Sequence, residues 1–348
     1  MNVFITGVAG FIGSNLCRRI LAESLDIIVI GIDNLNDYYD VNIKLYHLEQ
    51  LVEYSDRFVF IKGNIADKVL IENIFTQYKP EIVLNFAGQA GVRYSITNPD
   101  LYIESNLIGF YNILEACRHS YDNGNPGVRH LIYASSSSVY GSNKKVPHCT
   151  NDKADTPVSL YGATQKSNEL MAHAYSKLYN ISSTCLRFFT VYGPGGRPDM
   201  AYFNFTNKLL KGETIKIFNY GNCKRDFTYI DDIVEGIMRI MAKVPECKTN
   251  DDGLHIPPYK VYNIGSGRPV RLLDFVQILQ EELLRVDLLP VDFDIKSKME
   301  LVPMQPGDIL LTYAGTTLFE QDYSYKPITP LRDGLRKFAE WYKIFYNM

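Results

Sequence analysis

Three regularly spaced glycines follow the first apolar segment of the chain, in the stretch "TGVAGFIG". They are Gly7, Gly10 and Gly13. Glycine allows a tight turn and a close approach of the backbone to a ligand, and a helix that begins there offers unpaired N–H groups to a negative charge. A pyrophosphate is the ligand that suits this chemistry, although a plain turn between a strand and a helix would need the same glycines.

An acidic residue completes this pattern. Asp33 follows Gly13 by 20 residues, at the end of the second predicted strand, "IIVIGID". A carboxylate there accepts hydrogen bonds from the 2′-hydroxyl of an adenosine ribose and repels a 2′-phosphate. The glycines and the acid together predict a dinucleotide site that takes NAD in preference to NADP.

Serine hydroxyls form a second candidate site. Residues 135–138 are all serines, and they come directly after the apolar segment "HLIYA". Open parallel sheets bind ligands at the carboxyl ends of their strands. The position of the run therefore favours a ligand site over a polar loop.

The elements that must position these groups alternate along the first half of the chain. Segments rich in Val, Ile and Phe, such as "NVFIT", "EIVLNFAG" and "TCLRFF", are separated by stretches with helical spacing. This alternation predicts a Rossmann-type α/β fold, with a doubly wound parallel sheet and helices on both faces. We expect residues 1–190 to form the NAD-binding domain, with a segment at about 220–242 returning to it. Residues 191–348 would form mainly a smaller carboxy-terminal α/β lobe that closes over the strand ends.

Composition limits the partners and the location. The 348 residues are 46% hydrophobic and 22% charged, which is typical of an ordinary soluble globular protein, and the net charge is -3. This charge gives no electrostatic reason to expect nucleic acid or an anionic membrane as a partner. The sequence contains no run of 18 apolar residues, so it predicts no membrane-spanning helix. The six cysteines are scattered, which favours a cytoplasmic location, and the six histidines lack metal-ligand spacing.

A family resemblance covers nearly the whole chain. The stretches that carry it are "TGVAGFIGSNL", "DNLNDYYD", "AGQAGVRYSITNPDLYIESNLIGFYNILEACRH", "SSSSVYG", "PVSLYGATQKSNELMAH", "LRFFTVYGPGGRPDMA", "KRDFTYIDDIVEGI" and "MQPGDI". In this order they resemble the extended short-chain dehydrogenase/reductases that modify nucleotide sugars, and within them the UDP-glucuronate 4-epimerases.

The resemblance implies an NAD-dependent isomerase. Such an enzyme oxidises C4 of UDP-glucuronate, allows the 4-keto intermediate to rotate, and returns the hydride to the other face, which gives UDP-galacturonate. It also implies a UDP-sugar-binding lobe, a homodimer formed by helices, and a place in polysaccharide biosynthesis.

The resemblance gives the acid/base role to Tyr161 and the orientation of the sugar hydroxyl to Ser136. Where the family has a lysine four residues after the tyrosine, this chain has Gln165. Tyrosine has an ordinary pKa of about 10 and needs a nearby positive charge to act as a base at neutral pH. Lys166 lies about 100° further around the helix, so we interpret it as a solvated surface lysine.

The effect of the missing lysine charge on the pKa of the phenol can be calculated approximately. A cation about 5 Å from the phenol, at an effective dielectric near 20, is worth roughly 3 kcal/mol, or about two pKa units. We therefore expect cofactor and sugar-nucleotide binding to persist while turnover is reduced.

The remaining site residues are also carried over from the family. Those that match its cofactor-binding positions are Gly7, Gly10, Phe11, Ile12, Gly13, Asp33, Asn34, Asn64, Ile65, Ala87 and Tyr161. Those that match its substrate-binding positions are Arg93, Ser137, Ser138, Thr190, Arg197, Arg225 and Asp308. Among these, the hydroxyls of Ser137, Ser138 and Thr190 would hold the uronate carboxylate, Arg225 the diphosphate and Asp308 the uridine ribose.

Several departures keep alternatives open. The family more often has Asp at position 64, His at 85 and Ala at 88, where this chain has Asn64, Asn85 and Gly88. Related decarboxylases and dehydratases carry an acid where this chain has Ser138, which favours epimerisation. Three hypotheses remain: an epimerase for UDP-glucuronate, an epimerase for a neutral UDP-hexose such as UDP-glucose or UDP-N-acetylglucosamine, and a catalytically impaired protein that binds UDP-sugars.

Overall fold

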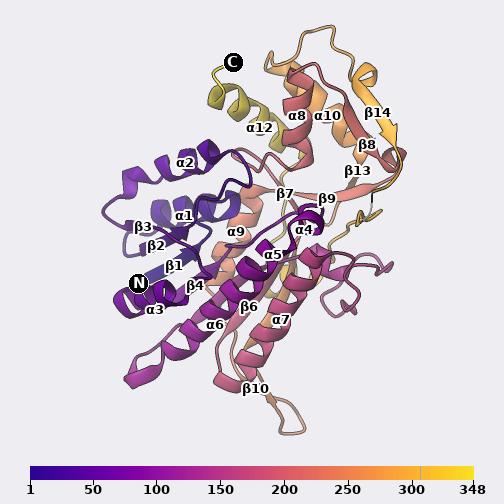
Figure 1. The fold of residues 1–348 in the computed structure, drawn as a ribbon. Helices are drawn as coiled ribbons and strands as arrows, with labels where there is room; N and C mark the ends of the chain where they lie inside the picture. The colour runs from indigo at the N-terminus through magenta and orange to yellow at the C-terminus, as the bar shows by residue number, and fades with distance from the viewer. Residues whose placement is uncertain (306) are drawn as a thin grey trace.

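The centre of the molecule is a sheet of seven parallel strands (Figure 1). The structure is a computed structural model that describes residues 1–305 and 307–348. The strands stand in the order β12, β6, β5, β4, β1, β2, β3, and each neighbouring pair is parallel. Their bounds are β1 Asn2–Thr6, β2 Ile28–Asp33, β3 Phe58–Lys62, β4 Ile82–Asn85, β5 His130–Ser136, β6 Ser183–Phe188 and β12 Tyr259–Ile264. The order reverses between β1 and β4, as in a doubly wound sheet, so the predicted fold class is confirmed.

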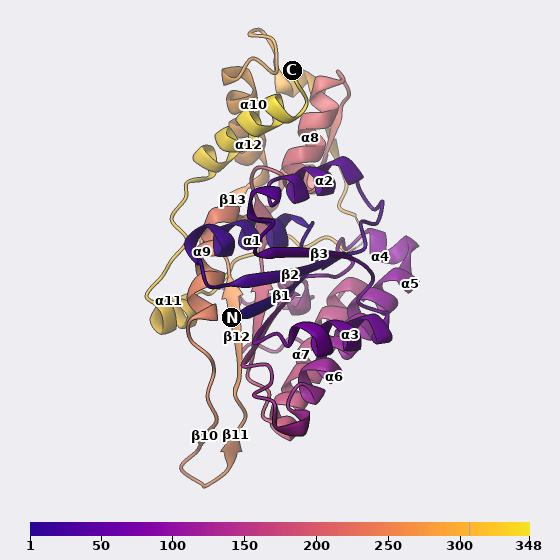
Figure 2. The same ribbon diagram turned by 90° about the vertical axis from the view of Figure 1, so that its left-hand side faces the viewer.

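Helices cover both faces of the sheet (Figure 2). On one face lie α1 Phe11–Glu23 and α9 Ile230–Met241, and on the other lie α3 Lys68–Tyr78, α6 Gly109–His119 and α7 Leu160–Tyr179. The alternation of side chains along β1 explains both layers, because Val3 and Ile5 join the buried cluster of Leu16 in α1. Between them, Phe4 points the other way and joins the cluster of Ile113 in α6.

The carboxy-terminal part of the chain builds a lobe above the strand ends (Figure 1). It consists of α8 Ala201–Leu210, β8 Ile215–Phe218, α10 Leu272–Arg285, β14 Met299–Val302 and α12 Leu331–Phe345. A three-stranded sheet of β7 Thr190–Tyr192, β9 Lys224–Tyr229 and β13 Pro269–Arg271 connects the lobe to the rest of the molecule. Phe203, Phe275 and Phe338 of the lobe are fully buried in the same continuous cluster as Val3. The lobe is therefore packed firmly onto the sheet.

Two later segments return to the main sheet. Helix α9 packs against α1, and β12 pairs with β6 at the edge of the sheet. β12 comes from the part of the chain that the sequence analysis placed in the lobe, and the proposed division into two domains stays a prediction. Within residues 1–305 and 307–348, no helix combines the length and apolar character needed to cross a lipid bilayer.

Candidate active site

A cavity of about 1110 Å³ lies between the carboxyl ends of the strands and the lobe. All the residues that the sequence analysis singled out for catalysis, cofactor binding or substrate binding line it. The fold thus brings together groups that are far apart in sequence, from Gly7 to Asp308. Their individual roles stay predictions.

The glycine-rich turn forms one end of this cavity. Gly7 has a φ of +69°, and a Cβ there would lie 2.8 Å from the backbone nitrogen of Ala87. A Cβ on Gly13 would lie 2.3 Å from the carbonyl oxygen of Gly7. The following helix α1 has Gly10 as its N-cap, without a side-chain cap and without an acid in its first turn. Its free N–H groups suit a pyrophosphate, so this end of the cavity fits a dinucleotide.

Asp33 stands at the end of β2, beside the turn. Its carboxylate accepts hydrogen bonds from the N–H groups of Ala9, at 3.1 Å, and Leu35, at 2.9 Å. Burial raises the pKa of this carboxyl, against these hydrogen bonds and the positive charge of Lys44. Each carboxylate oxygen retains lone pairs that can accept from a ribose hydroxyl.

Lys44 is a cavity residue that the sequence analysis missed. It lies in α2 Val41–Glu49, and its ammonium donates to the carbonyl and side-chain oxygens of Asn36, both at 2.7 Å. Burial lowers the pKa of Lys44, while Asp33 opposes that change. The lysine therefore fixes the loop after β2 and places a positive charge near Asp33.

A serine turn continues from β5 at the middle of the cavity. The Ser136 hydroxyl donates to the hydroxyl of Ser138 and accepts from the N–H of Ser138, both at 3.2 Å. These bonds fold residues 136–138 into a compact turn whose hydroxyls line the cavity. The serine run thus lies at the carboxyl end of β5 and at the cavity, and its role in binding a ligand stays a prediction.

Helix α7 brings Tyr161 to the serine turn. The Ser159 hydroxyl caps the helix by accepting from the N–H of Gly162 at 3.0 Å. A Cβ on Gly162 would lie 2.7 Å from the carbonyl oxygen of Ser138, so glycine permits the close approach of helix and turn. The ring of Tyr161 also meets the ring of Tyr102 edge-on, with centroids 6.1 Å apart.

The electrostatic setting of Tyr161 is mixed. Burial raises the pKa of its phenol above the usual value. The nearby hydroxyl of Ser136 and the positive charge of Arg197 act to lower that pKa, while Asp199 acts to raise it. The phenol is thus a weak base whose strength depends on groups from other elements.

Gln165 and Lys166 occupy different environments on α7. Gln165 is buried at the cavity, and its Oε1 atom has no hydrogen-bond partner within the described residues. Lys166 is not the solvated surface lysine we expected, because its side chain is only 24% exposed and its ammonium lies 3.0 Å from a carboxylate oxygen of Glu169. Glu169 is buried between Lys166, Arg187 at 2.7 Å and the hydroxyl of Ser135 at 2.8 Å. This network holds the charge of Lys166 away from the cavity.

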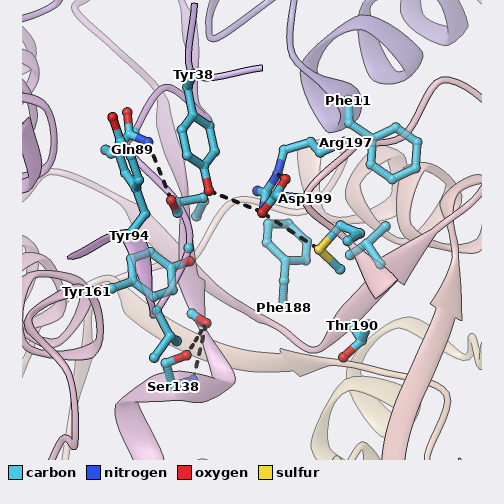
Figure 3. A pocket seen from close by; sticks show the side chains of 18 of the residues that line it. Phe11, Tyr38, Gln89, Tyr94, Ser138, Tyr161, Phe188, Thr190, Arg197 and Asp199 are labelled. Atoms are coloured by element: carbon cyan, nitrogen blue, oxygen red, sulfur yellow. Dashed lines mark hydrogen bonds and ion pairs between the residues drawn. The ribbon is translucent and has the colours of Figure 1, made fainter. Parts of the chain in front are cut away.

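Arg197 forms part of the wall opposite the serine turn (Figure 3). Its guanidinium makes two hydrogen bonds to the carboxylate of Asp199, both at 2.9 Å. The Tyr38 hydroxyl donates to the same carboxylate at 3.2 Å. Arg197 is therefore a fixed residue of the cavity wall.

The far end of the cavity is built from both parts of the molecule. Arg93, which follows β4, donates to both carboxylate oxygens of Asp308, at 3.1 and 2.8 Å. Its guanidinium also lies over the ring of Phe218 in β8, 4.3 Å from the centroid. Arg225 in β9 lines the same end, and burial lowers its pKa. Two residues that the sequence analysis assigned to substrate thus pair with each other here.

Positive charge predominates in the lining, although the whole chain has a net charge of -3. The basic residues are Lys44, Arg93, Arg197, Lys208, Lys216 and Arg225, and the acidic residues are Asp33, Asp199 and Asp308. An excess of cations suits ligands that carry phosphate groups.

Comparison with known proteins agrees with this geometry. Residues 3–265 match the NAD dependent epimerase/dehydratase family. The chain belongs to this family. The resemblance noted from the sequence motifs is therefore confirmed.

Individual members of the epimerase/dehydratase family are similar over the full length of the chain. UDP-glucuronate 4-epimerase 4 of Arabidopsis thaliana is 42% identical over 100% of this chain and 76% of its own length. A probable UDP-glucuronate 4-epimerase of Rhizobium meliloti is 38% identical over 100% of this chain and 98% of its own. The crystal structure of UDP-glucuronic acid 4-epimerase from Bacillus cereus, in complex with UDP-glucuronic acid and NAD, is 30% identical with a TM-score of 0.85. That match covers 99% of this chain and 100% of the other.

Asn106 is another residue that the sequence analysis missed in this member of the epimerase/dehydratase family. It lies in a π-helical segment, Ile103–Ile108, which precedes α6. Its amide accepts from the N–H of Gln89 at 2.7 Å and donates to the hydroxyl of Thr164 at 3.0 Å. Asn106 therefore joins the loop after β4 to helix α7. No local pattern could reveal this, because its partners lie 17 and 58 residues away.

Proposed function

We propose that this protein is an NAD-dependent UDP-glucuronate 4-epimerase, an isomerase that interconverts UDP-glucuronate and UDP-galacturonate. The observation that carries the proposal is the placement of Tyr161 against the serine turn, in a cavity that runs from the glycine-rich turn to Arg225. Relatives with this activity match the chain along its whole length. Such a cavity suits a sugar held between a dinucleotide and a nucleoside diphosphate.

The cofactor would be held by groups at the glycine-rich end. Gly7, Gly10 and Gly13 would admit the pyrophosphate, and Asp33 would accept from the adenosine ribose, with Phe11, Ile12, Asn34, Asn64, Ile65 and Ala87 as further contacts. When bound, NAD would accept a hydride from C4 of the sugar and return it to the opposite face. Because the cofactor is regenerated, the net reaction is an isomerisation.

The chain's own residues would manage the proton and the sugar. Tyr161 would take the proton from the C4 hydroxyl and later return it, while Ser136 would orient that hydroxyl. Arg225 would bind the diphosphate through the two-pronged geometry of its guanidinium. The Asp308 carboxylate would accept a hydrogen bond from the uridine ribose. For this, Arg93 must release the carboxylate or share it with the ribose.

Hydroxyl groups, and not positively charged side chains, would bind the carboxylate of the uronate. Ser137, Ser138 and Thr190 line the cavity beside Ser136 and can donate hydrogen bonds to a carboxylate. A 4-keto uronate is a β-keto acid, and it loses carbon dioxide when the bond to its carboxylate stands perpendicular to the ring. Tethers that keep the carboxylate nearer the ring plane would favour epimerisation over decarboxylation.

One observation favours a weakened enzyme or a catalytically impaired UDP-sugar-binding protein. Gln165 provides no charge to Tyr161, and Lys166 is occupied by Glu169. We infer reduced turnover with binding preserved. Substrate binding without any product after long incubation would select the impaired protein instead.

The test is to mix the purified protein with UDP-glucuronate, first without and then with added NAD, and to follow the sugar protons by NMR. The proposal expects signals of UDP-galacturonate to appear. UDP-glucose and UDP-N-acetylglucosamine are the matched substrates without a carboxylate. Conversion of these neutral sugars in preference to the uronate would contradict the proposal and favour a hexose epimerase.

A homodimer is also part of the proposal. Apolar side chains on the outer face of the α6 and α7 layer are exposed, among them Ile108 at 47%, Leu170 at 61% and Leu178 at 70%. Such a face suits a matching face of a second copy. The mass in solution, from light scattering, would test this, with Leu170→Glu expected to give a monomer. We further infer a cytoplasmic location, with reduced cysteines, and a product that feeds polysaccharide biosynthesis.

A further inference from the structure

The proposed reaction needs a positive charge near Tyr161 that helix α7 does not supply. Gln165 is neutral, and the ammonium of Lys166 is paired with Glu169 at 3.0 Å. Glu169 in turn binds Arg187, whose guanidinium is also buried. Moving either cation to the phenol would leave a buried carboxylate short of partners, which is costly.

Another cation lines the same cavity as Tyr161 from a different element. Arg197 lies in the loop between β7 and α8, which carries the sequence "GPGGRPDM" at residues 193–200. The loop is fixed by backbone bonds from Gly196 to Gly193, at 3.3 Å, and from Met200 to Arg197, at 3.1 Å. The ion pair with Asp199 then fixes the guanidinium itself. Figure 3 shows Arg197 and Asp199 in the same cavity as Tyr161.

We propose that Arg197, across the cavity, supplies the positive charge that position 165 lacks, and that Asp199 both anchors and moderates it. This inference rests on the proposed function and extends it. Arg197 acts through Tyr161 and is therefore a positioning residue in this role. The base strength of the phenol would be set by a loop near the lobe and no longer by the catalytic helix.

The groups that face Tyr161 support this assignment. From the serine turn comes Ser136, from the helix before the π-helical segment comes Tyr102, and from the lobe side come Arg197 and Asp199. Arg197 and Asp199 are charged groups that act on the pKa of the phenol in opposite directions.

The opposite signs give a sharp experiment. The full-length protein is loaded with NAD, and kcat for UDP-glucuronate is measured across acid, neutral and alkaline pH for Arg197→Gln, Arg197→Lys and Asp199→Asn. Removing the cation should move the acid limb of the profile to higher pH and lower kcat about tenfold at neutral pH. Removing the anion should move the limb to lower pH. Arg197→Lys keeps the charge and should return the limb toward its original position.

A purely structural role would give another result. Arg197→Gln and Asp199→Asn break the same ion pair, so a structural role predicts losses in the same direction and no opposed shifts. Shifts of the same sign, or none, would overturn the proposal.

A second readout separates this inference from the proposed function. Tyrosines labelled with carbon-13 at the ζ carbon report ionisation by NMR in the NAD-loaded protein without turnover. The Tyr161 signal is identified by its loss in Tyr161→Phe. Opposed shifts of its titration without any epimerisation would support the role of Arg197 and contradict the proposed activity. Epimerisation without opposed shifts would contradict the role of Arg197 alone.

Discussion

The two ends of the cavity are formed by different kinds of groups, mainly backbone at one end and side chains at the other. The cofactor end consists mainly of backbone, with glycines that admit close approach and a helix N-terminus without a side-chain cap, and it adds one side-chain carboxylate at a strand end. The end at which we propose proton transfer consists of side chains, and Gln165 stands there at the position where the family has a lysine. A site made of backbone tolerates changes in neighbouring side chains, whereas a site made of charges changes with a single residue. Binding and turnover can therefore diverge in this protein.

The largest effect should come from Tyr161→Phe, which removes the hydroxyl that we propose transfers the proton and leaves the cofactor end intact. We expect kcat to fall about 10²–10⁴-fold, with NAD affinity unchanged. Kinetics and NAD titration of the same preparations would measure both. Tyr179→Phe, on the exposed end of the same helix, is the control. Parallel loss of turnover and NAD binding would show that the two ends are not separable.

The substitution Gly7→Ala should impair NAD binding at the cofactor end. A Cβ at Gly7 would meet the backbone of Ala87 at 2.8 Å, so we expect NAD affinity to fall about 100-fold through displacement of the turn. Gly253→Ala is a matched control, because Gly253 also has a positive φ, of +77°, but no heavy atom within 4 Å. The control should cost about 1 kcal/mol of stability and leave NAD binding unchanged. If both variants lost NAD affinity equally, backbone strain would explain the loss, and the contact with Ala87 would not.

Gln165→Lys sharpens the comparison by restoring a cation at the proton-transfer end. Burial raises the pKa of Tyr161, so the base is active only as pH rises toward that pKa. A new cation lowers it, which should move the acid limb of kcat to lower pH and raise kcat at neutral pH by about 10–100-fold. Gln165→Met controls for shape without charge. An unchanged rate in the lysine variant would refute the weakened-enzyme account.

The smallest effect should come from Asp33→Asn at the cofactor end. The amide keeps an acceptor but loses the charge that repels a 2′-phosphate. We expect the preference for NAD over NADP to narrow by about tenfold, measured by competitive titration of both cofactors. Asp37→Asn changes an exposed acid in the next loop and should have no effect. If the preference were unchanged, Asp33 would not be what discriminates between the cofactors.

Much of this site could be predicted because its signals are local. The glycine spacing and the position of Asp33 follow from one strand, one turn and one helix. The start of α7 is also local, since Ser159 caps the helix through Gly162, three residues on. The closing contact of Gly162 with Ser138, however, depends on how the helix lies against β5.

Lys166 shows where such reasoning fails. Its position around the helix correctly excluded it from the cavity lining, but its partner was not visible in the sequence. The carboxylate that binds it is Glu169, three residues away, and Glu169 is buried only because β5 and β6 bring Ser135 and Arg187 to it. A solvated lysine and a half-buried ion pair look alike in sequence.

The alternating fold, the glycine-rich turn for the cofactor and the absence of the family's lysine at position 165 all follow from the amino-acid sequence alone. Each of these depends on backbone preferences or residue identity over a few neighbouring positions. Only the tertiary structure decided which charges meet. Tyr38 and Asp199 are 161 residues apart and Arg93 and Asp308 are 215 apart, and Coulomb interactions act through space once packing has brought such segments together.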